Sequence, residues 1–156
     1  MTTTVGKPAP DFSLPTDGNG KVSLSGLKGR NVVVYFYPKD DTPGCTVEAC
    51  AFRDGLPKFS GLNATIIGVS KDDTKSHQKF KTKFKLNFPL ASDTSKVTEA
   101  YGAWQQKSMY GRTYMGIERS TFLVGPTGKI LQEWRKVKVT GHVAEVLAAV
   151  TSAAAK

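Results

Sequence analysis

The segment 31–37 reads Asn-Val-Val-Val-Tyr-Phe-Tyr and is almost continuously apolar. Such a run, rich in β-branched and aromatic residues, is typical of a strand that is buried on both faces of a sheet. A second run of this kind, Ala-Thr-Ile-Ile-Gly-Val-Ser, occupies residues 64–70. Between them, residues 45–59 form a helix-like stretch that Gly55 and Pro57 are expected to limit. Buried strands alternating with helices predict a partly parallel sheet that is covered on both faces.

The pattern outward from these strands completes an α/β chain. Residues 6–14 and 21–24, joined by the turn signal Asp-Gly-Asn-Gly at 17–20, predict an N-terminal β-hairpin. The other predicted elements are a helix at 73–84, an extended piece at 88–91, a short helix at 95–101, strands at 120–124 and 129–134, and an amphipathic helix that contains 143–150. This order predicts a thioredoxin-like fold, with a central mixed sheet flanked by helices. The length of 156 residues predicts one domain over 1–156.

The chain is basic, since 22 Lys and Arg residues outweigh 13 Asp and Glu residues and give a formal charge of +9. A basic surface raises the question of a nucleic-acid or anionic-membrane partner. The densest stretch, 71–85, carries six Lys and two Asp on a predicted helix. Because no zinc-finger spacing or RRM-type aromatic signature accompanies it, we interpret it as a solvated helix face and expect no nucleic-acid partner.

The sequence contains no recognisable membrane or export segment. The longest apolar runs, such as 32–36, span only a few residues, so no transmembrane helix is predicted. The N-terminal segment 1–7 lacks a basic region followed by an apolar stretch, and it lacks the Arg- and Ser-rich character of a transit peptide. We therefore expect a cytoplasmic protein without a membrane partner.

The chain contains two cysteines, Cys45 and Cys50, and two histidines, His77 and His142. Two cysteines are too few for a disulfide-dense secreted scaffold. A four-ligand zinc site would need all four of these residues, at spacings that do not suit a zinc motif, so we expect no metal. The pattern predicts His77 as a half-buried helix residue and His142 as a solvent-facing residue.

The residues before Cys45 are typical of the start of a helix. Thr42 suits the N-cap and Pro43 the first helical position, which puts Cys45 in the first turn. There the free N–H groups and the positive end of the helix macrodipole favour a thiolate. We therefore expect an exposed, reactive thiol at this position, since such surroundings lower a thiol pKa.

Cys50 follows five residues later on the same predicted helix. In an ideal helix the Cα atoms of residues so spaced lie roughly 8.6 Å apart, whereas a disulfide needs Cα atoms within about 7 Å. Pairing of the two cysteines therefore requires the helix to unwind partly, which suits a redox cycle better than a structural cross-link. The alternative is that both are inert buried thiols. This alternative is weaker for Cys45, which follows Thr-Pro-Gly in a polar loop.

The stretch 36–50 closely resembles the peroxiredoxins and reads Phe-Tyr-Pro-Lys-Asp-Asp-Thr-Pro-Gly-Cys-Thr-Val-Glu-Ala-Cys. Pro38, Thr42 and Cys45 fit the family motif Pro-x-x-x-Thr-x-x-Cys. Cys50 is similar to the second cysteine of the peroxiredoxin Q group, whose members are also called bacterioferritin comigratory proteins. The resemblance continues through most of the chain, at 6–12, 87–90, 101–104 and 116–122.

The resemblance implies a thiol-dependent peroxidase that needs no cofactor. Cys45 would be the peroxidatic cysteine, which attacks the peroxide and becomes a sulfenic acid. Cys50 would be the resolving cysteine, which forms an intramolecular disulfide with Cys45. Thioredoxin or a similar dithiol reductant would then reduce this disulfide. Hydrogen peroxide and small organic hydroperoxides would be the substrates, and the protein would be a monomer.

Four further residues receive roles from the resemblance. Thr42 would hydrogen-bond the peroxide and orient it, and Pro38 would shield the site from water. Arg119 would lie against Cys45 and stabilise both the thiolate and the transition state, while Glu48 would steady Arg119. Local sequence alone would make Arg119 a surface ion-pair residue and Glu48 a solvated helix residue.

Two other functions remain open at this point. A thiol–disulfide exchange or holdase protein would share the cysteines but lack peroxidase activity. A basic binding module would contain the cysteines incidentally and would bind nucleic acid with a steep salt dependence. Trp104, Tyr110 and Tyr114 lie in or beside a predicted loop and are candidates either for walls of the active site or for ordinary packing.

Overall fold

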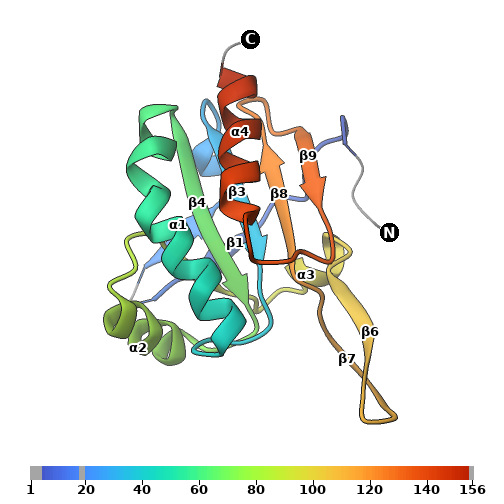
Figure 1. The fold of residues 1–156 in the computed structure, drawn as a ribbon. Helices are drawn as coiled ribbons and strands as arrows, with labels where there is room; N and C mark the ends of the chain where they lie inside the picture. Colours follow the sequence, from blue (N-terminus) through green and yellow to red (C-terminus); the bar gives the residue numbers. More distant parts are fainter. Residues whose placement is uncertain (1–4, 18–19, 155–156) are drawn as a thin grey trace.

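A five-stranded mixed sheet forms the centre of the computed structural model, which describes residues 5–17 and 20–154 (Figure 1). Its strands, in spatial order, are β5 (Leu90–Ser92), β4 (Ala64–Ser70), β3 (Asn31–Phe36), β8 (Ser120–Val124) and β9 (Ile130–Trp134). β3, β4 and β5 run parallel, whereas β8 is antiparallel to β3 and β9 is antiparallel to β8. The predicted central mixed sheet is therefore confirmed.

The two faces of β3 point into two separate hydrophobic clusters. Val32, Val34 and Phe36 belong to one cluster, and Val33 and Tyr35 belong to the other. All residues of the strand are buried, as the continuous apolar run predicts. The segment that follows β3 is thus anchored in the buried centre of the sheet.

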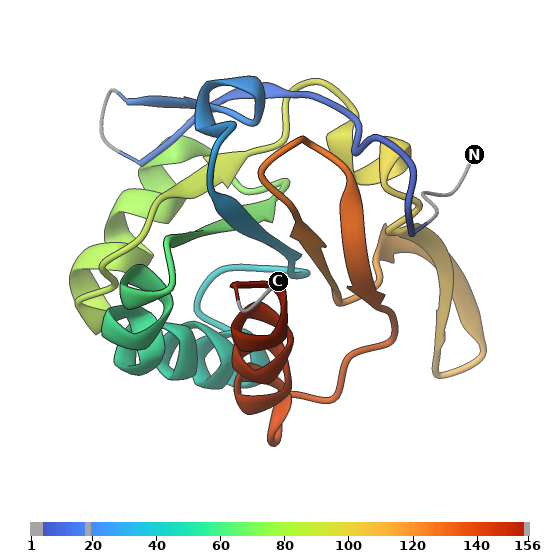
Figure 2. The same ribbon diagram turned by 90° about the horizontal axis from the view of Figure 1, so that it is seen from above.

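Two layers cover the faces of the sheet (Figure 2). The helices α1 (Pro43–Gly61) and α4 (His142–Ala154) lie side by side over one face, and α2 (Thr74–Phe84) continues this layer beside β5. The other face is covered by smaller elements, which are β1 (Ser13–Pro15), β2 (Lys21–Ser23), the 3-10 helix η1 (Ser25–Leu27) and α3 (Val97–Ala100). This arrangement is the thioredoxin-like α/β fold that the sequence predicts.

The predicted N-terminal hairpin is present as β1 and β2, which pair antiparallel with Leu14 opposite Val22. Its predicted turn spans 17–20, of which residues 18–19 lie outside the described part of the chain. Leu14 is fully buried in the cluster on this side of the sheet. The hairpin therefore covers one of the two clusters to which β3 contributes.

Helix α1 is longer than the sequence predicts, because Gly55 and Pro57 do not limit it. Proline has no N–H for the carbonyl of the residue four positions earlier, which here is Arg53. That carbonyl instead accepts a hydrogen bond of 3.2 Å from Asn87 Nδ2. A Cβ on Gly55 would lie 3.6 Å from Val143 of α4, an ordinary van der Waals distance, so the glycine lies where the two helices pack. A tertiary hydrogen bond therefore compensates for the proline within the helix.

The segment 104–117 is a hairpin and not the loop that the sequence predicts. Its strands β6 (Trp104–Met109) and β7 (Arg112–Ile117) form a separate two-stranded sheet that extends away from the main body (Figure 1). Tyr110 and Gly111 form the turn, both with positive φ, of 53° and 77°. Most of β7 is exposed, so the strand lacks the apolar alternation by which a half-buried strand is recognised.

The basic stretch at α2 is a solvated helix face, as predicted. Lys75, Lys79 and Lys83 are exposed, while His77 and Phe80 point toward the core. None of the helices in the described part of the chain is both long and apolar enough to cross a membrane.

Candidate active site

The start of α1 has the predicted arrangement. Thr42 is the N-cap with extended backbone angles (φ −100°, ψ 156°), Pro43 is the first helical residue, and Cys45 lies in the first turn. The Thr42 hydroxyl does not cap the helix but donates to the carbonyl of Lys39 at 2.9 Å. The N–H groups of the first turn, beside Cys45, are therefore not taken up by the Thr42 side chain.

Arg119 links Cys45 to Glu48, although it lies far along the chain between β7 and β8. Its Nη2 donates to Cys45 Sγ at 3.3 Å, and its Nη1 donates to Glu48 Oε1 at 2.7 Å. The Glu48 side chain is fully buried, and the Arg119 side chain is 16% exposed. The structure thus brings three of the predicted site residues into one group, and Glu48 is not a solvated helix residue.

The charges of this group influence one another. Burial raises the pKa of Glu48 to about 7, against the lowering effect of Arg119. Glu48 Oε2 has no hydrogen-bond partner among the described residues, so little compensates its loss of hydration. Burial acts to lower the pKa of Arg119, but Glu48 and Cys45 outweigh this effect and raise it above its ordinary value. The guanidinium therefore stays cationic beside the sulfur, where it favours the thiolate.

Cys45 is buried, with 1% exposure, so the expectation of an exposed thiol is wrong. The residue belongs to the hydrophobic cluster that also contains Tyr35 and Phe52, because position 45 faces inward where α1 packs on the sheet. In this conformation the residue has almost no contact with solvent.

Gly44 is a site residue that the sequence analysis did not single out. A Cβ at this position would lie 3.1 Å from Arg119 Nη2, closer than an ordinary van der Waals contact. The backbone of Gly44 does not have a positive φ, so a side chain at this position would crowd Arg119 and would not strain the backbone. A glycine in the first turn of a helix, directly before Cys45, was the signal that could have identified it.

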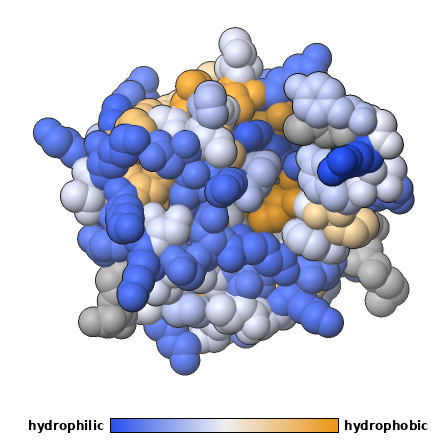
Figure 3. Space-filling model, turned by 90° about the horizontal axis from the view of Figure 1, so that it is seen from below, coloured by the Kyte–Doolittle hydropathy of each residue, from blue (hydrophilic) through white to orange (hydrophobic). Residues whose placement is uncertain are grey.

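Pro38 is half-buried and lines a hollow beside the β6–β7 hairpin. The other lining residues are Lys71, Trp104, Lys107, Tyr114, Met115, Gly116 and Ile117. Figure 3 shows apolar surface recessed between hydrophilic side chains next to this hairpin. Of the three aromatic candidates, Trp104 and Tyr114 line the hollow, whereas Tyr110 lies almost fully exposed at the hairpin turn.

Cys50 lies on α1 with Cys45 and is half-buried. Both cysteines are free thiols, and the helix between them is continuous. A disulfide between them therefore requires the first turns of α1 to unwind, as the spacing in the sequence predicts.

Both histidines are more buried than the sequence predicts. His142 is 2% exposed, because its ring packs edge-on against Phe52 and Trp134 and its Nε2 lies 2.7 Å from Thr121 Oγ1. Burial lowers the pKa of His142 to about 4, so the ring is neutral. His77 is fully buried in α2. The predictions of a solvent-facing His142 and a half-buried His77 are therefore wrong.

The sequence as a whole is related to proteins of one family. The model of the AhpC/TSA family matches residues 5–133. Peroxiredoxin Bcp of Bacillus subtilis is 53% identical over 148 residues, which cover 94% of this chain and 94% of that protein. The chain belongs to the peroxiredoxin family.

Solved structures extend this relationship to the fold. A bacterioferritin comigratory protein of Xanthomonas campestris, whose structures were described for its alkyl peroxide reduction activity, superposes with a TM-score of 0.90 at 43% identity, covering 97% of this chain and 99% of that chain. A peroxiredoxin Q variant of Xylella fastidiosa superposes with a TM-score of 0.92 at 40% identity, covering 97% and 98%. The predicted resemblance to the Q group is confirmed, and this peroxiredoxin is a peroxidase.

Proposed function

We propose that Cys45 is the peroxidatic cysteine of this peroxiredoxin, and the observation that carries the proposal is the contact between its sulfur and Arg119. The thiolate attacks the terminal oxygen of a hydroperoxide, so that an S–O bond forms and the O–O bond breaks. The departing alkoxide or hydroxide takes up a proton, and a sulfenic acid remains on Cys45. Arg119 offsets the negative charge of the thiolate and of the departing oxygen, because Glu48 already orients its guanidinium before the reaction.

Three neighbouring residues assist this step in the proposal. Glu48 orients Arg119 through their 2.7 Å hydrogen bond. Thr42 turns its hydroxyl from the Lys39 carbonyl to the peroxide and aligns the O–O bond with the sulfur. Pro38 presents an apolar ring without an N–H, which keeps water away from the reacting atoms.

Cys50 is the resolving cysteine in this proposal. Once the first turns of α1 unwind, its sulfur attacks the sulfenic sulfur, an S–S bond forms and the S–O bond breaks. The hydroxyl leaves as water with the proton of the Cys50 thiol. The product is an intramolecular disulfide, which protects Cys45 from further oxidation to the sulfinic acid. The position of both free thiols on one helix supports this pairing.

The proposed substrates are hydrogen peroxide and small organic hydroperoxides. The enclosed position of Cys45 suits a small oxidant, and the similar Xanthomonas protein is described for alkyl peroxide reduction. Thioredoxin or a similar dithiol then reduces the disulfide by thiol–disulfide exchange. We place the protein in the cytoplasm, where such reductants keep thiols reduced, and as a monomer that needs no membrane or nucleic-acid partner.

The test mixes fully reduced protein with one equivalent of hydrogen peroxide, follows thiol loss by stopped flow, and reads the product by intact mass. We expect both thiols to disappear far faster than free cysteine reacts, and the product to be an intramolecular disulfide. Cys45→Ser should abolish the fast reaction. Cys50→Ser should keep the fast loss of one thiol but end at an oxidised Cys45. A wild-type rate like that of free cysteine would reject these roles and favour a thiol–disulfide exchange or holdase protein.

Recycling is tested separately with thioredoxin, thioredoxin reductase and NADPH. We expect continuous NADPH consumption that depends on peroxide and on both cysteines. Turnover with a small dithiol but not with thioredoxin would reject thioredoxin as the reductant while leaving the peroxide chemistry intact.

A further inference from the structure

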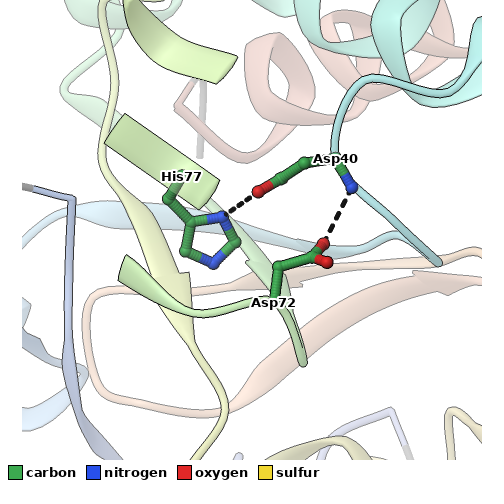
Figure 4. Close-up of side chains that lie close together, drawn as sticks. All are labelled: Asp40, Asp72 and His77. Carbon is green, nitrogen blue, oxygen red and sulfur yellow. Dashed lines mark hydrogen bonds and ion pairs between the residues drawn. The ribbon is translucent and has the colours of Figure 1, made fainter. Parts of the chain in front are cut away.

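A buried polar cluster lies behind the loop that leads to Cys45, and it has no role in the steps described above. It contains Asp40 from this loop, Asp72 from the segment after β4, and His77 from α2 (Figure 4). Asp40 and His77 are 7% and 0% exposed. Their side chains point toward each other, and Asp72 is directed at the backbone of Asp40 (Figure 4). The cluster therefore joins three segments that are separate in the sequence.

Asp40 is held by several hydrogen bonds. Its Oδ1 accepts from Tyr37 OH at 2.6 Å, and its Oδ2 accepts from Ser76 Oγ at 2.8 Å. His77 Nδ1 lies 2.7 Å from the same Oδ2. The backbone N–H of Asp40 donates to Asp72 Oδ2 at 2.8 Å. The residue is thus tied to α2 through its side chain and to the segment after β4 through its backbone.

Both ring nitrogens of His77 face oxygen atoms. Its Nδ1 faces the Asp40 carboxyl group, and its Nε2 lies 3.1 Å from the carbonyl oxygen of Ala91. A carbonyl oxygen only accepts hydrogen bonds, so Nε2 donates to Ala91, and one hydrogen is shared between Nδ1 and Asp40 Oδ2. The Tyr37 hydroxyl, 3.3 Å from Nδ1, donates to Asp40. Asp40 and His77 therefore form a buried, directly hydrogen-bonded pair.

The ligand atoms of Asp40, Asp72 and His77 lie within 4.8 Å of one another, which is also compatible with a metal site. The direct contact favours the hydrogen-bonded pair, because two ligands each about 2.0–2.1 Å from a shared zinc ion would stand more than about 3 Å apart. Asp40 Oδ2 and His77 Nδ1 are only 2.7 Å apart. We name this hydrogen-bonded pair, together with the Ser76 hydrogen bond, the Asp40–His77 clamp.

The clamp fixes the chain five residues before Cys45. Asp41, the next residue, has a left-handed backbone with φ of 57°, which a residue other than glycine rarely adopts. Thr42 then begins α1. While Asp40 is held, the four residues between Asp40 and Cys45 limit how far Cys45 can move when it leaves the helix. Release of Asp40 lengthens the free segment back toward the end of β3.

We propose that the Asp40–His77 clamp limits the rate at which the first turns of α1 unwind, and thereby sets how the sulfenic acid divides between disulfide formation and over-oxidation. The inference rests on the proposed roles of Cys45 and Cys50. Disulfide formation needs the unwound helix. A second peroxide instead reacts while Cys45 lies against Arg119. A second S–O bond then forms, the O–O bond breaks, the departing oxygen leaves as water or an alcohol with the sulfenic proton or one from solvent, and Cys45 becomes a sulfinic acid. The clamp residues are positioning residues, because they act through the loop and not on the sulfur.

Two variants loosen the clamp to different degrees. Ser76→Ala removes one hydrogen bond to Asp40, and His77→Gln removes the imidazole that bonds both Asp40 and the carbonyl of Ala91. Amide hydrogen exchange of residues 46–50 in the reduced protein measures unwinding, because Thr46 is the first residue of α1 whose N–H bonds to a carbonyl four positions earlier. We expect exchange in H77Q to rise about tenfold, because leaving a buried carboxyl group without one of its partners shifts a local equilibrium by about that factor. Exchange in S76A should rise by a smaller factor.

The chemical readout follows a single turnover by rapid quenching and intact mass. Conversion of the sulfenic acid to the disulfide should accelerate in the same order, H77Q above S76A above wild type. The first reaction of Cys45 with peroxide should change by less than about twofold, since the folded form still predominates. The sulfinic fraction at high peroxide should fall. A merely structural role would not accelerate one step while preserving the other.

Lys83→Ala is the matched control. Lys83 pairs with Asp41 at 2.8 Å and so joins the same loop to the same helix, but on the exposed surface. Because an exposed pair contributes little, amide exchange and both reaction steps should stay at wild-type values.

The clamp is refuted if amide exchange in S76A and H77Q stays at the wild-type rate, or if both chemical steps slow together with a loss of global stability. If H77Q does not fold, S76A decides alone. Amide exchange needs no peroxide, so it tests the clamp even if the wild type forms no disulfide. That last result would reject the proposed roles of the cysteines and not the clamp.

Discussion

The two thiols of α1 lie on one helix, five residues apart, yet their surroundings differ. Cys45 is buried in the first turn and accepts a hydrogen bond from Arg119, whereas Cys50 is half-buried further along. The residue type and the helix are the same, so neither accounts for the difference. It comes from the position at a helix start and from a cation 74 residues away in the chain. The chemistry of a cysteine thus depends on contacts made by the whole fold.

Replacing Arg119 should remove most of the difference in peroxide reactivity between Cys45 and Cys50. We expect Arg119→Ala to lower the rate constant of Cys45 with hydrogen peroxide by about 10²–10³, the effect of losing one fixed donor to a developing anion. The rate constant of Arg119→Lys should lie between those of wild type and R119A. Lysine keeps the positive charge, but its single ammonium group cannot bond Cys45 and Glu48 in the fixed geometry of a planar guanidinium. Stopped-flow thiol loss in a Cys50→Ser background measures both variants. An unchanged rate in R119A would show that the helix start alone activates the sulfur.

The pH dependence of stability tests the ionisation of Glu48, which hydrogen-bonds the same Arg119. Its pKa is about 7 in the folded protein, above the ordinary value of 4.5. Between these values the folded form keeps a proton that the unfolded chain releases, so the contribution of Glu48 to stability declines as pH rises through this window. Glu48→Gln cannot titrate. We therefore expect its unfolding free energy, relative to wild type, to increase from pH 4.5 to pH 7 by on the order of 3 kcal/mol.

Urea unfolding of wild type and E48Q at several pH values measures this difference. Other titrating groups cancel in the comparison, since they are common to both proteins. A difference that does not vary with pH would mean that Glu48 is ionised in the folded protein throughout the window, and that Arg119 outweighs its burial.

A side chain at position 44 should weaken the hydrogen bond between Arg119 and Cys45 without removing it. The new Cβ in Gly44→Ala would press on Arg119 Nη2, and we expect the rate constant of Cys45 to fall about fivefold, in line with about 1 kcal/mol for a disturbed hydrogen bond. Gly61→Ala is the control, because a Cβ there meets no atom within 4 Å. Alanine is the better helix residue at both positions, so a slower G44A with a wild-type G61A would identify space, and not helix stability, as the cause.

A change in the C-terminal half of α1 should not alter the difference in peroxide reactivity between Cys45 and Cys50. Asn87→Ala removes the donor to the Arg53 carbonyl, and we expect a loss of about 1 kcal/mol in unfolding stability with an unchanged rate of Cys45. Adding Pro57→Ala should restore stability, because residue 57 then supplies its own N–H to that carbonyl. Thermal unfolding of both variants measures this. A slower Cys45 in N87A would show that the helix transmits strain along its length.

The features that could be predicted from the sequence are those whose signals are local. The continuous apolar run predicts β3 because burial on both faces permits no alternation. Thr42 and Pro43 predict the helix start because capping involves residues a few positions apart. Arg119 was associated with Cys45 only through family resemblance, since nothing in its local sequence indicates a contact 74 residues away.

The features that could not be predicted depend on contacts between distant segments. Pro57 stays within α1 because Asn87 compensates its missing N–H. His77 follows an apolar helix pattern that gives no hint of Asp40, its partner 37 residues earlier. His142 has the local sequence of an exposed helix start but meets two aromatic rings from other elements. In each case the deciding contact forms only when the sheet brings the segments together.

The enclosure of Cys45 also determines which oxidants can equilibrate with it. Cys45 has 1% exposure, which disfavours the approach of a bulky disulfide, whereas a peroxide brings only two oxygen atoms to the reacting centre. Under the roles proposed for Cys45 and Cys50, the folded enzyme is shielded from exchange with bulky disulfides. Oxidation by peroxide then takes place in the folded conformation, and reduction of the disulfide in the unwound one. The redox state of the enzyme would follow the flux of peroxide and the supply of the dithiol reductant, and not exchange of the folded Cys45 with ambient disulfides.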